Sequence, residues 1–389
     1  MSTTNDAEKQ KTTRPEWQPE DAGSEFACRV MDGVATGHDG ISSYQAAAEA
    51  AAAAAAPTPV YRRPVFTADD YANGVLSGDR AMLGRAITLM ESSAPKHIDT
   101  AQEVLKRLLP HSGKSIRVGI TGVPGVGKSS FIETFGVKLL EQGHRVAVLA
   151  VDPSSSISGG SILGDKTRME QLSRDTRCFI RPSPAGKTLG GVARKTRESM
   201  LVCEAAGFDV ILIETVGVGQ SETAVRSMVD FFLLLMLSGA GDELQGIKKG
   251  IMELADALVI TKADGANKLP AQTARNEYER AMHYLQPATE GWTSHAYTCS
   301  SLTGEGILEI WRVIEEFRSV TTASGVFEQH RRDQNVKWVH EMVDAKLHER
   351  FIRHEGVRGI LADVEREVAE GTLPAVSAMH RLLAVFDGK

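Results

Sequence analysis

The residues best suited to chemistry form a glycine-rich run that ends in Lys128 and Ser129. The run fits the pattern G-x-x-x-x-G-K-[ST]. It follows an apolar segment at 116–120, which predicts a buried strand, and precedes a helical pattern at 130–140. Glycines let successive backbone N–H groups turn toward one anion, and a helix N-terminus adds positive charge. Lys128 would contact the β- and γ-phosphates, and the Ser129 hydroxyl would bind Mg²⁺. The residues expected to hold phosphate are Gly122, Val123, Pro124, Gly125, Val126, Gly127, Lys128, Ser129 and Ser130.

A second motif, Thr261-Lys262-Ala263-Asp264, follows another apolar run and indicates which base the site prefers. It is similar to the guanine motif N/T-K-x-D, whose carboxylate accepts hydrogen bonds from guanine N1–H and the 2-amino group. Adenine offers neither donor, so ATP would leave a buried Asp264 unpaired, and such losses discriminate strongly. The stem of Lys262 can lie along the base plane, and Thr261 stands where Asn is commoner. The backbone amides expected to contact the base are those near Ser300, Ser301 and Leu302.

Carboxylates at strand ends are the candidate Mg²⁺ ligands besides Ser129. Glu214 stands where proteins with this glycine loop usually have an Asp, and it could hold Mg²⁺ directly or through water. Asp152 ends the second strand, and Asp165 lies in the serine- and glycine-rich loop that follows. Either aspartate could instead cap nearby backbone amides. We interpret both as ligands of Mg²⁺ or of its water shell.

Two further features bear on hydrolysis. Val218 occupies the position where many GTPases have a water-orienting Gln, and Gln220 is out of register, so we expect slow intrinsic hydrolysis. The glycine-containing run 238–248 ends in Lys248, and Lys249 follows. Either lysine could reach the phosphates and neutralise charge in the transition state. Spacing alone favours the simpler interpretation, a solvated lysine at a helix start.

These motifs lie at the ends of a β–α alternation that predicts a mostly parallel, doubly wound sheet. In such a sheet the ligand binds beyond the carboxyl ends of the strands, where every motif above is located. The fold class that we expect is an α/β P-loop NTPase with further helices at both ends. After 116–120 the expected strands are 145–151, 179–180, 210–213, 230–237, 257–260 and 295–298, and the expected helices are 191–206, 269–285 and 307–317.

Changes in sequence character divide the chain into four regions. Residues 1–60 are polar and then alanine-rich, and we expect a disordered leader. Residues 61–112 predict a helical segment, with Thr67 capping its first helix and a second helix over 94–109, on the outside of the core. Residues 113–322 form the predicted nucleotide-binding domain. Residues 323–389 have helical periodicity without strand signals and predict a helical hairpin.

Composition excludes several classes of protein. The chain has 389 residues and a net charge of −6, which argues against a nucleic-acid binder. Its four cysteines are scattered and form no C-x-x-C pair, which favours reduced thiols and a cytoplasmic location. The sequence contains no run of eighteen apolar residues, so no membrane span is predicted, and the N-terminus has no signal pattern. His340-Glu341 lacks a second His four residues on, so no H-E-x-x-H metal-hydrolase motif is present.

Four segments, in this order, carry a resemblance to one family. They are the glycine loop at 122–129, Asp152-Pro153-Ser154, the run at 214–220, and the guanine motif at 261–264. Over roughly residues 67–387 the chain resembles the MeaB/ArgK family of GTPases, the methylmalonyl-CoA mutase-associated chaperones. The runs E-T-V-G-V-G-Q-S-E at 214–222 and G-D-K-T-R-M at 164–169 are more specific to that family than the glycine loop.

The resemblance implies a homodimeric GTPase that binds GTP or GDP with Mg²⁺ and docks on an adenosylcobalamin-dependent methylmalonyl-CoA mutase. It would gate cofactor loading and protect the mutase from inactivation. The C-terminal helices would be a dimerisation arm, and Lys248 would belong to a third switch loop that couples the partner to hydrolysis. The residues implied to serve nucleotide, Mg²⁺ and catalysis are Lys128, Ser129, Asp152, Asp165, Glu214 and Lys248.

Two other functions remain open from the sequence. A metal-insertion GTPase of a sister family would have a similar nucleotide fold, but such proteins often carry Cys- or His-rich metal loops, and this sequence has none. A module that holds GTP without turnover is compatible with Val218. Phosphate release measured with and without a mutase separates that module from a partner-stimulated GTPase.

Overall fold

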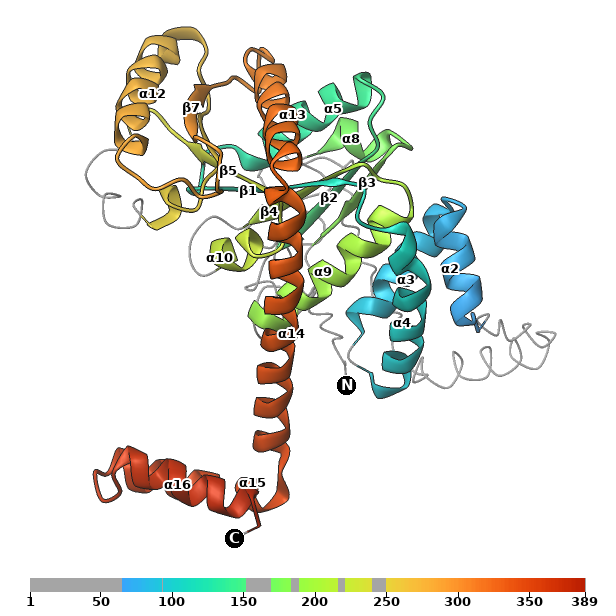
Figure 1. Ribbon diagram of the computed structural model, residues 1–389, viewed down its shortest axis with the longest axis vertical. Helices are drawn as coiled ribbons and strands as arrows, with labels where there is room; N and C mark the ends of the chain where they lie inside the picture. The colour runs from blue at the N-terminus through green and yellow to red at the C-terminus, as the bar shows by residue number, and fades with distance from the viewer. Residues whose placement is uncertain are drawn as a thin grey trace, which may run out of the picture. The chain divides into compact units, whose positions relative to one another are not determined.

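A seven-stranded parallel sheet forms the centre of the computed structural model, which describes residues 65–92, 94–151, 169–182, 189–215, 221–239 and 250–388 (Figure 1). The strand order is β3-β2-β4-β1-β5-β6-β7, and every neighbouring pair is parallel. The expected doubly wound sheet is confirmed, and the strand before the glycine loop lies between β4 and β5. The strands are β1 Ile116–Gly122, β2 Val146–Val151, β3 Cys178–Arg181, β4 Val210–Thr215, β5 Phe231–Met236, β6 Ala257–Ile260 and β7 His295–Thr298.

Helices cover both faces of the sheet, which explains why the strand sequences are almost continuously apolar. On β2, Val146 and Val148 join the core cluster beneath helices α5 and α13, whereas Ala147 and Leu149 join the cluster beneath α9. The layers are visible in Figure 1, with α5 and α13 on one side and α9 and α10 on the other. This arrangement brings the carboxyl ends of all the strands to one edge. The helices that flank the sheet are α5 Lys128–Glu141, α8 Glu170–Arg174, α9 Leu189–Ala205, α10 Ser221–Arg226, α12 Lys268–Met282 and α13 Ile307–Ala323.

The N-terminal helical segment contains three described helices, α2 Ala68–Leu76, α3 Arg80–Glu91 and α4 Pro95–Leu108. Thr67 caps the first as predicted: its hydroxyl accepts from the Asp70 amide at 3.2 Å, and the Asp70 carboxylate accepts from the Thr67 amide at 2.8 Å. Asp79 begins α3 by accepting two backbone N–H bonds at 2.7 and 3.1 Å, so the expected first helix is divided in two. Ile87 and Val104 are fully buried in the cluster that includes α9, so these helices extend the core.

Three helices follow α13, where the sequence predicts a hairpin. They are α14 Val326–Arg353, α15 Glu355–Ala369 and α16 Ala375–Phe386. With 28 residues, α14 is about 42 Å long at the usual helical rise. The Phe351 and Phe386 rings have centroids 5.3 Å apart, which joins α14 to α16. The two helices of the predicted hairpin correspond to α14 and α15, and α16 is a further helix that packs against them. No described helix is both long and apolar enough to cross a membrane.

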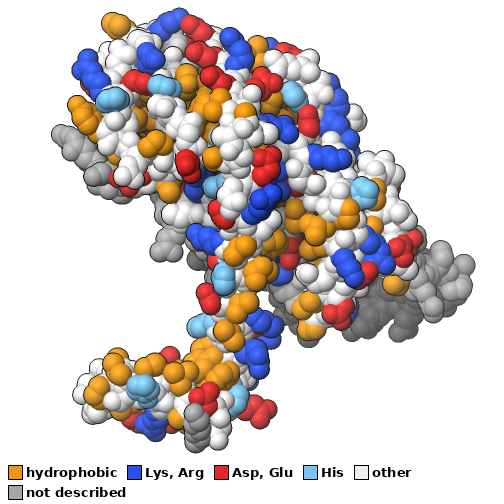
Figure 2. All heavy atoms as spheres, in the orientation of Figure 1, with side chains coloured by type: hydrophobic (Ala, Val, Ile, Leu, Met, Phe, Trp, Pro, Cys, Tyr) orange, Lys and Arg blue, Asp and Glu red, His pale blue; other side chains and the backbone are white. Residues whose placement is uncertain are grey.

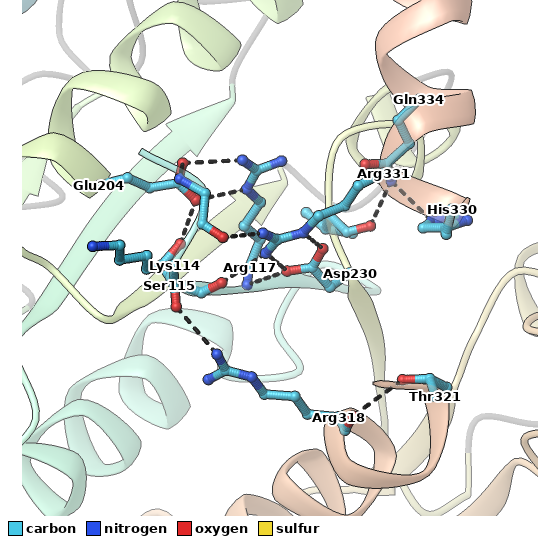
Figure 3. Close-up of polar contacts among 12 residues, drawn as sticks. Lys114, Ser115, Arg117, Glu204, Asp230, Arg318, Thr321, His330, Arg331 and Gln334 are labelled. Atoms are coloured by element: carbon cyan, nitrogen blue, oxygen red, sulfur yellow. Dashed lines mark hydrogen bonds and ion pairs between the residues drawn. The ribbon is translucent and has the colours of Figure 1, made fainter. Parts of the chain in front are cut away.

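Buried charges fix the amino end of β1. The Glu204 carboxylate, on α9, accepts from the Arg117 guanidinium at 2.9 and 3.0 Å (Figure 3). It also accepts from the Ser115 hydroxyl at 2.5 Å and the Gly113 amide at 2.8 Å. The Glu204 side chain is fully buried, and that of Arg117 is 9% exposed. Because the bidentate pair is supplemented by two further hydrogen bonds, the cost of burying both charges is offset.

Arg331 attaches α14 to the same end of the sheet (Figure 3). Its guanidinium donates to both carboxylate oxygens of Asp230 at 2.7 Å, and to the carbonyl oxygens of Gly113 and Ser115 at 2.5 and 2.6 Å. The Asp230 carboxylate, 1% exposed, also accepts from the Arg117 amide at 2.8 Å. The first turns of α14 are therefore held by a bidentate, buried ion pair.

Replacing Arg331 with Met should lower the free energy of unfolding by about 3–5 kcal/mol, because Asp230 would stay buried without its guanidinium partner. Arg353→Met is a suitable control, since that side chain is 78% exposed and pairs with Glu349 one turn away on α14. The control should lose about 0.5 kcal/mol or less. Urea unfolding followed by circular dichroism measures both variants. Equal, small losses would show that the Asp230–Arg331 pair does not hold α14.

Candidate nucleotide-binding site

The glycine loop connects β1 to α5 as the motif predicts. At Gly122 a Cβ atom would lie 2.5 Å from the Leu235 carbonyl oxygen of β5, so a side chain cannot fit there. Gly127 has φ 92° and precedes the first residue of α5, a left-handed conformation that favours glycine. The loop therefore turns tightly off a central strand and directs the backbone N–H groups of the first turn of α5 toward one point.

Lys128 lies across this loop. Its Nζ donates to the Gly122 carbonyl oxygen at 2.9 Å. Burial lowers the pKa of Lys128 from its ordinary value, while the nearby carboxylates of Glu214 and Glu222 act to raise it. A partly desolvated ammonium group gains more from an anionic partner than an exposed one does. This position suits a lysine that contacts phosphate oxygens.

Ser129 and Glu214 come together from α5 and β4. The Ser129 hydroxyl donates to Glu214 Oε1 at 3.1 Å, and Glu214 is the register partner of Ile120 on β1. A hydroxyl and a carboxylate oxygen at this spacing are hard ligands of the kind that Mg²⁺ uses, usually together with phosphate oxygens and water. The donor set therefore fits Mg²⁺. Among the described residues no group of three or more His, Cys, Asp or Glu could hold a metal ion by itself.

Several predicted residues lie outside the described part of the chain. They are Asp152 and Asp165, the hydrolysis-related positions Val218 and Gln220, and the lysines Lys248 and Lys249. Their assignment to Mg²⁺, to catalysis or to a third switch loop rests on the sequence.

The predicted guanine motif is joined directly to the glycine loop. The Thr261 hydroxyl donates to the Val126 carbonyl oxygen at 2.7 Å, and Lys262 Nζ donates to the Gly125 carbonyl oxygen at 2.9 Å. Lys262 has φ 57°, the sole positive value among the described non-glycine residues. A strained backbone of this kind persists where surrounding contacts impose it, and it occurs often at ligand sites. Thr261 therefore supplies a hydroxyl link to the loop at the position where Asn is commoner.

Asp264 and Ser300 lie together at the far end of this motif. The Ser300 hydroxyl donates to Asp264 Oδ2 at 2.5 Å, and the Ser300 oxygen accepts from the amides of Leu302 and Thr303 at 3.2 and 3.1 Å. Ser300 is fully buried, whereas Leu302 is 84% exposed. The predicted base-contacting segment therefore adjoins the predicted base-reading carboxylate.

No role was predicted for Glu222, although it belongs to the family-specific run at 214–222. Glu222 is 1% exposed in the first turn of α10, and its charge acts on Lys128. Its place one residue after a helix start gave no signal, because acidic residues are common there for reasons of helix stability alone. Thr121 and Thr215 were also missed, and their buried hydroxyls form a 2.8 Å bond between the ends of β1 and β4.

Known proteins that are similar to this chain indicate its family. The family model described as methylmalonyl Co-A mutase-associated GTPase MeaB matches residues 83–356. A putative GTPase of Caulobacter vibrioides is 55% identical over 323 residues, 83% of this chain and 99% of that protein. GTPase ArgK of Escherichia coli is 49% identical and covers 78% of this chain and 92% of its own length. The mitochondrial methylmalonic aciduria type A homolog of Mus musculus is 46% identical, covering 82% and 80% respectively.

A solved structure gives the same fold. The crystal structure of an LAO/AO transport system kinase superposes with a TM-score of 0.68 at 37% identity, over 84% of this chain and all of that one. The parallel sheet, the glycine loop and the relatives named as GTPases all indicate the same family. The chain is a P-loop GTPase and belongs to the MeaB family of methylmalonyl-CoA mutase-associated GTPases.

Proposed function

We propose that this GTPase uses GTP, with Mg²⁺, to gate cofactor loading and to protect an adenosylcobalamin-dependent methylmalonyl-CoA mutase. The observation that most supports GTP as the nucleotide is the attachment of the guanine motif to the glycine loop through Thr261 and Lys262. Through that attachment Asp264, the carboxylate proposed to read the base, would keep a set separation from Lys128. The mutase as partner rests on the description of the matching family and on relatives named for methylmalonic aciduria.

Each residue of the site has a separate task in this proposal. Backbone N–H groups of the glycine loop and the Lys128 ammonium group bind the phosphate oxygens. Asp264 accepts from guanine N1–H and the 2-amino group, and Ser300 fixes the rotation of its carboxylate. Ser129 and Glu214, with Asp152 and Asp165, would hold Mg²⁺, which supplies positive charge beside the phosphate oxygens.

Mutase-dependent hydrolysis is the second part of the proposal. Val218 replaces the usual water-orienting Gln, so the protein alone should hydrolyse GTP slowly. Lys248 would reach the phosphates when a bound mutase positions the run 238–248. A positive charge added to the transition state in this way accelerates other GTPases by about 10³–10⁵.

A homodimer formed through the C-terminal arm, α14 to α16, completes the proposal. Val336, Val339, Val343 and Leu347 recur every three or four residues on α14 and are 49–59% exposed. That spacing places them on one face of the helix. Figure 2 shows hydrophobic side chains along this helix and over the arm. An apolar groove of about 820 Å³ between α14, α15 and α16 lies beside them. A second copy of the chain would cover both surfaces.

Asp264→Asn should change the preferred nucleotide from GTP to XTP, because an amide donates where xanthine presents a carbonyl oxygen instead of the 2-amino group. Competition binding of GTP, XTP and ATP to wild type and variant measures the change. Asn276→Asp is a useful control, since this helical residue of α12 belongs to no part of the proposed site. A variant that still prefers GTP would show that Asp264 does not read the base.

Lys248→Ala should remove most of the mutase-stimulated hydrolysis while leaving GTP affinity unchanged, because the lysine would act on the transition state and not on the bound ground state. Single-turnover hydrolysis with and without a cobalamin-dependent mutase measures the effect, with Lys249→Ala as the neighbouring control. Equal stimulation of wild type and Lys248→Ala would remove this lysine from the mechanism. No stimulation of wild type would contradict the proposed link to a mutase.

The double substitution Val339→Asp and Val343→Asp should convert the protein from a dimer to a monomer, because a dimer would bury these charges without partners. Light scattering after size exclusion should then give about one chain mass, 42.0 kDa, in place of two. Leu269→Asp introduces a charge at a 76% exposed site on α12 and should leave the mass unchanged. A wild-type protein that is already monomeric would contradict the role given to the arm.

A further inference from the structure

Thr134 makes an unusual contact for a threonine within a helix. Such hydroxyls commonly bond the carbonyl four residues back in their own helix, as Thr321 does with Phe317 at 2.6 Å. Thr134, on α5, instead donates to the Ser301 carbonyl oxygen at 2.9 Å, across 167 residues of sequence. The helix that begins with Lys128 is thereby bonded to the loop at the base end of the site.

This bond is the first of a chain that ends on Asp264. The Ser301 carbonyl and the Leu302 N–H belong to one planar peptide unit, in which they point in opposite directions. The Leu302 N–H donates to Ser300 Oγ at 3.2 Å, and Ser300 Oγ donates to Asp264 Oδ2 at 2.5 Å. Every donor points from α5 toward Asp264. Hydrogen bonds aligned in this way polarise one another, so the chain is stronger than its separate members.

We propose that Thr134 is a positioning residue for base recognition. It holds the peptide between residues 301 and 302, so that the Ser300 hydroxyl keeps the Asp264 carboxylate turned for the guanine edge. The inference rests on the proposed role of Asp264 in reading guanine. It gives α5 a second task besides phosphate binding, because the same helix then sets the orientation of the group that selects the base.

A comparison of GTP with ITP isolates this role, since ITP lacks the 2-amino group from which Asp264 would accept. If Thr134 only stabilised the loop, its loss would weaken both nucleotides equally. If it orients Asp264, its loss would weaken GTP more than ITP. The measured quantity is therefore the ratio of the two dissociation constants, obtained by competition against a fluorescent guanine nucleotide.

Thr134→Val should reduce the preference for GTP over ITP by about two- to tenfold, the range expected for one net hydrogen bond. Thr134→Ser keeps the hydroxyl and should keep the preference. Thr321→Val removes a buried hydroxyl that bonds within α13 and should also leave the preference unchanged. In an Asp264→Ala background, Thr134→Val should have no further effect on the ratio, because the carboxylate that it orients is absent.

An unchanged ratio in Thr134→Val, or equal weakening of GTP and ITP, would overturn the inference. Circular dichroism melting of each variant identifies any that fail to fold. If Thr134→Val is among them, the test uses Thr134→Ser, in which the ratio of the GTP and ITP dissociation constants should equal that of the wild type. Failure of the proposed function has a different signature. The wild-type protein itself would bind ATP as tightly as GTP, before any substitution.

Discussion

Two hydrogen bonds from the guanine motif to the glycine loop set the separation between the phosphate end and the base end of the site. Thr261 and Lys262 donate to the carbonyl oxygens of Val126 and Gly125, within the glycine loop itself. The guanine motif and the glycine loop are therefore coupled. A ligand that spans both gains from this preorganisation, because the two binding groups need not be brought together when it binds. The sheet makes the contact possible, since only β5 separates β1 from β6.

The two ends of β1 have different physical roles. Its carboxyl end continues into the loop around Lys128. Its amino end is held by the buried pairs Arg117–Glu204 and Asp230–Arg331. Seven residues of strand separate these ends by about 20 Å, so substitutions at the charged end test stability without touching the proposed ligand site. The same charged end anchors α14, which links the nucleotide domain to the C-terminal arm.

Much of the fold could be predicted because its signals are local. The apolar run 257–260 predicted β6 with its observed ends, the segment 295–298 was also predicted with the ends of β7, and the glycine loop predicted the β1–α5 connection. Signals that depend on contacts between distant segments were harder to find. The helix α13 continues to Ala323, six residues beyond the predicted end. The long α14 is held by Arg331, whose partner lies 101 residues away.

The same distinction applies to the site. Motifs with fixed spacing contain Lys128, Ser129, Thr261 and Asp264, so these residues could be predicted from the sequence as parts of one site. Glu222 and Thr134 have their roles through groups that the fold brings near, and neither position shows a pattern. The positive φ of Lys262 is another feature that could not be predicted, since a lysine gives no indication of a left-handed backbone.

The most direct test of this account is the relative affinity for GDP and ADP in the presence of Mg²⁺, measured by calorimetry on the full chain. Both nucleotides offer the same diphosphate to the glycine loop and Lys128, so only the base distinguishes them. If Asp264 is held in register with that loop, GDP should bind at least about a hundredfold more tightly, because adenine lacks the N1–H and 2-amino donors that guanine offers to the carboxylate. Equal affinities would contradict the account, since the link between the glycine loop and the guanine motif would then select no base.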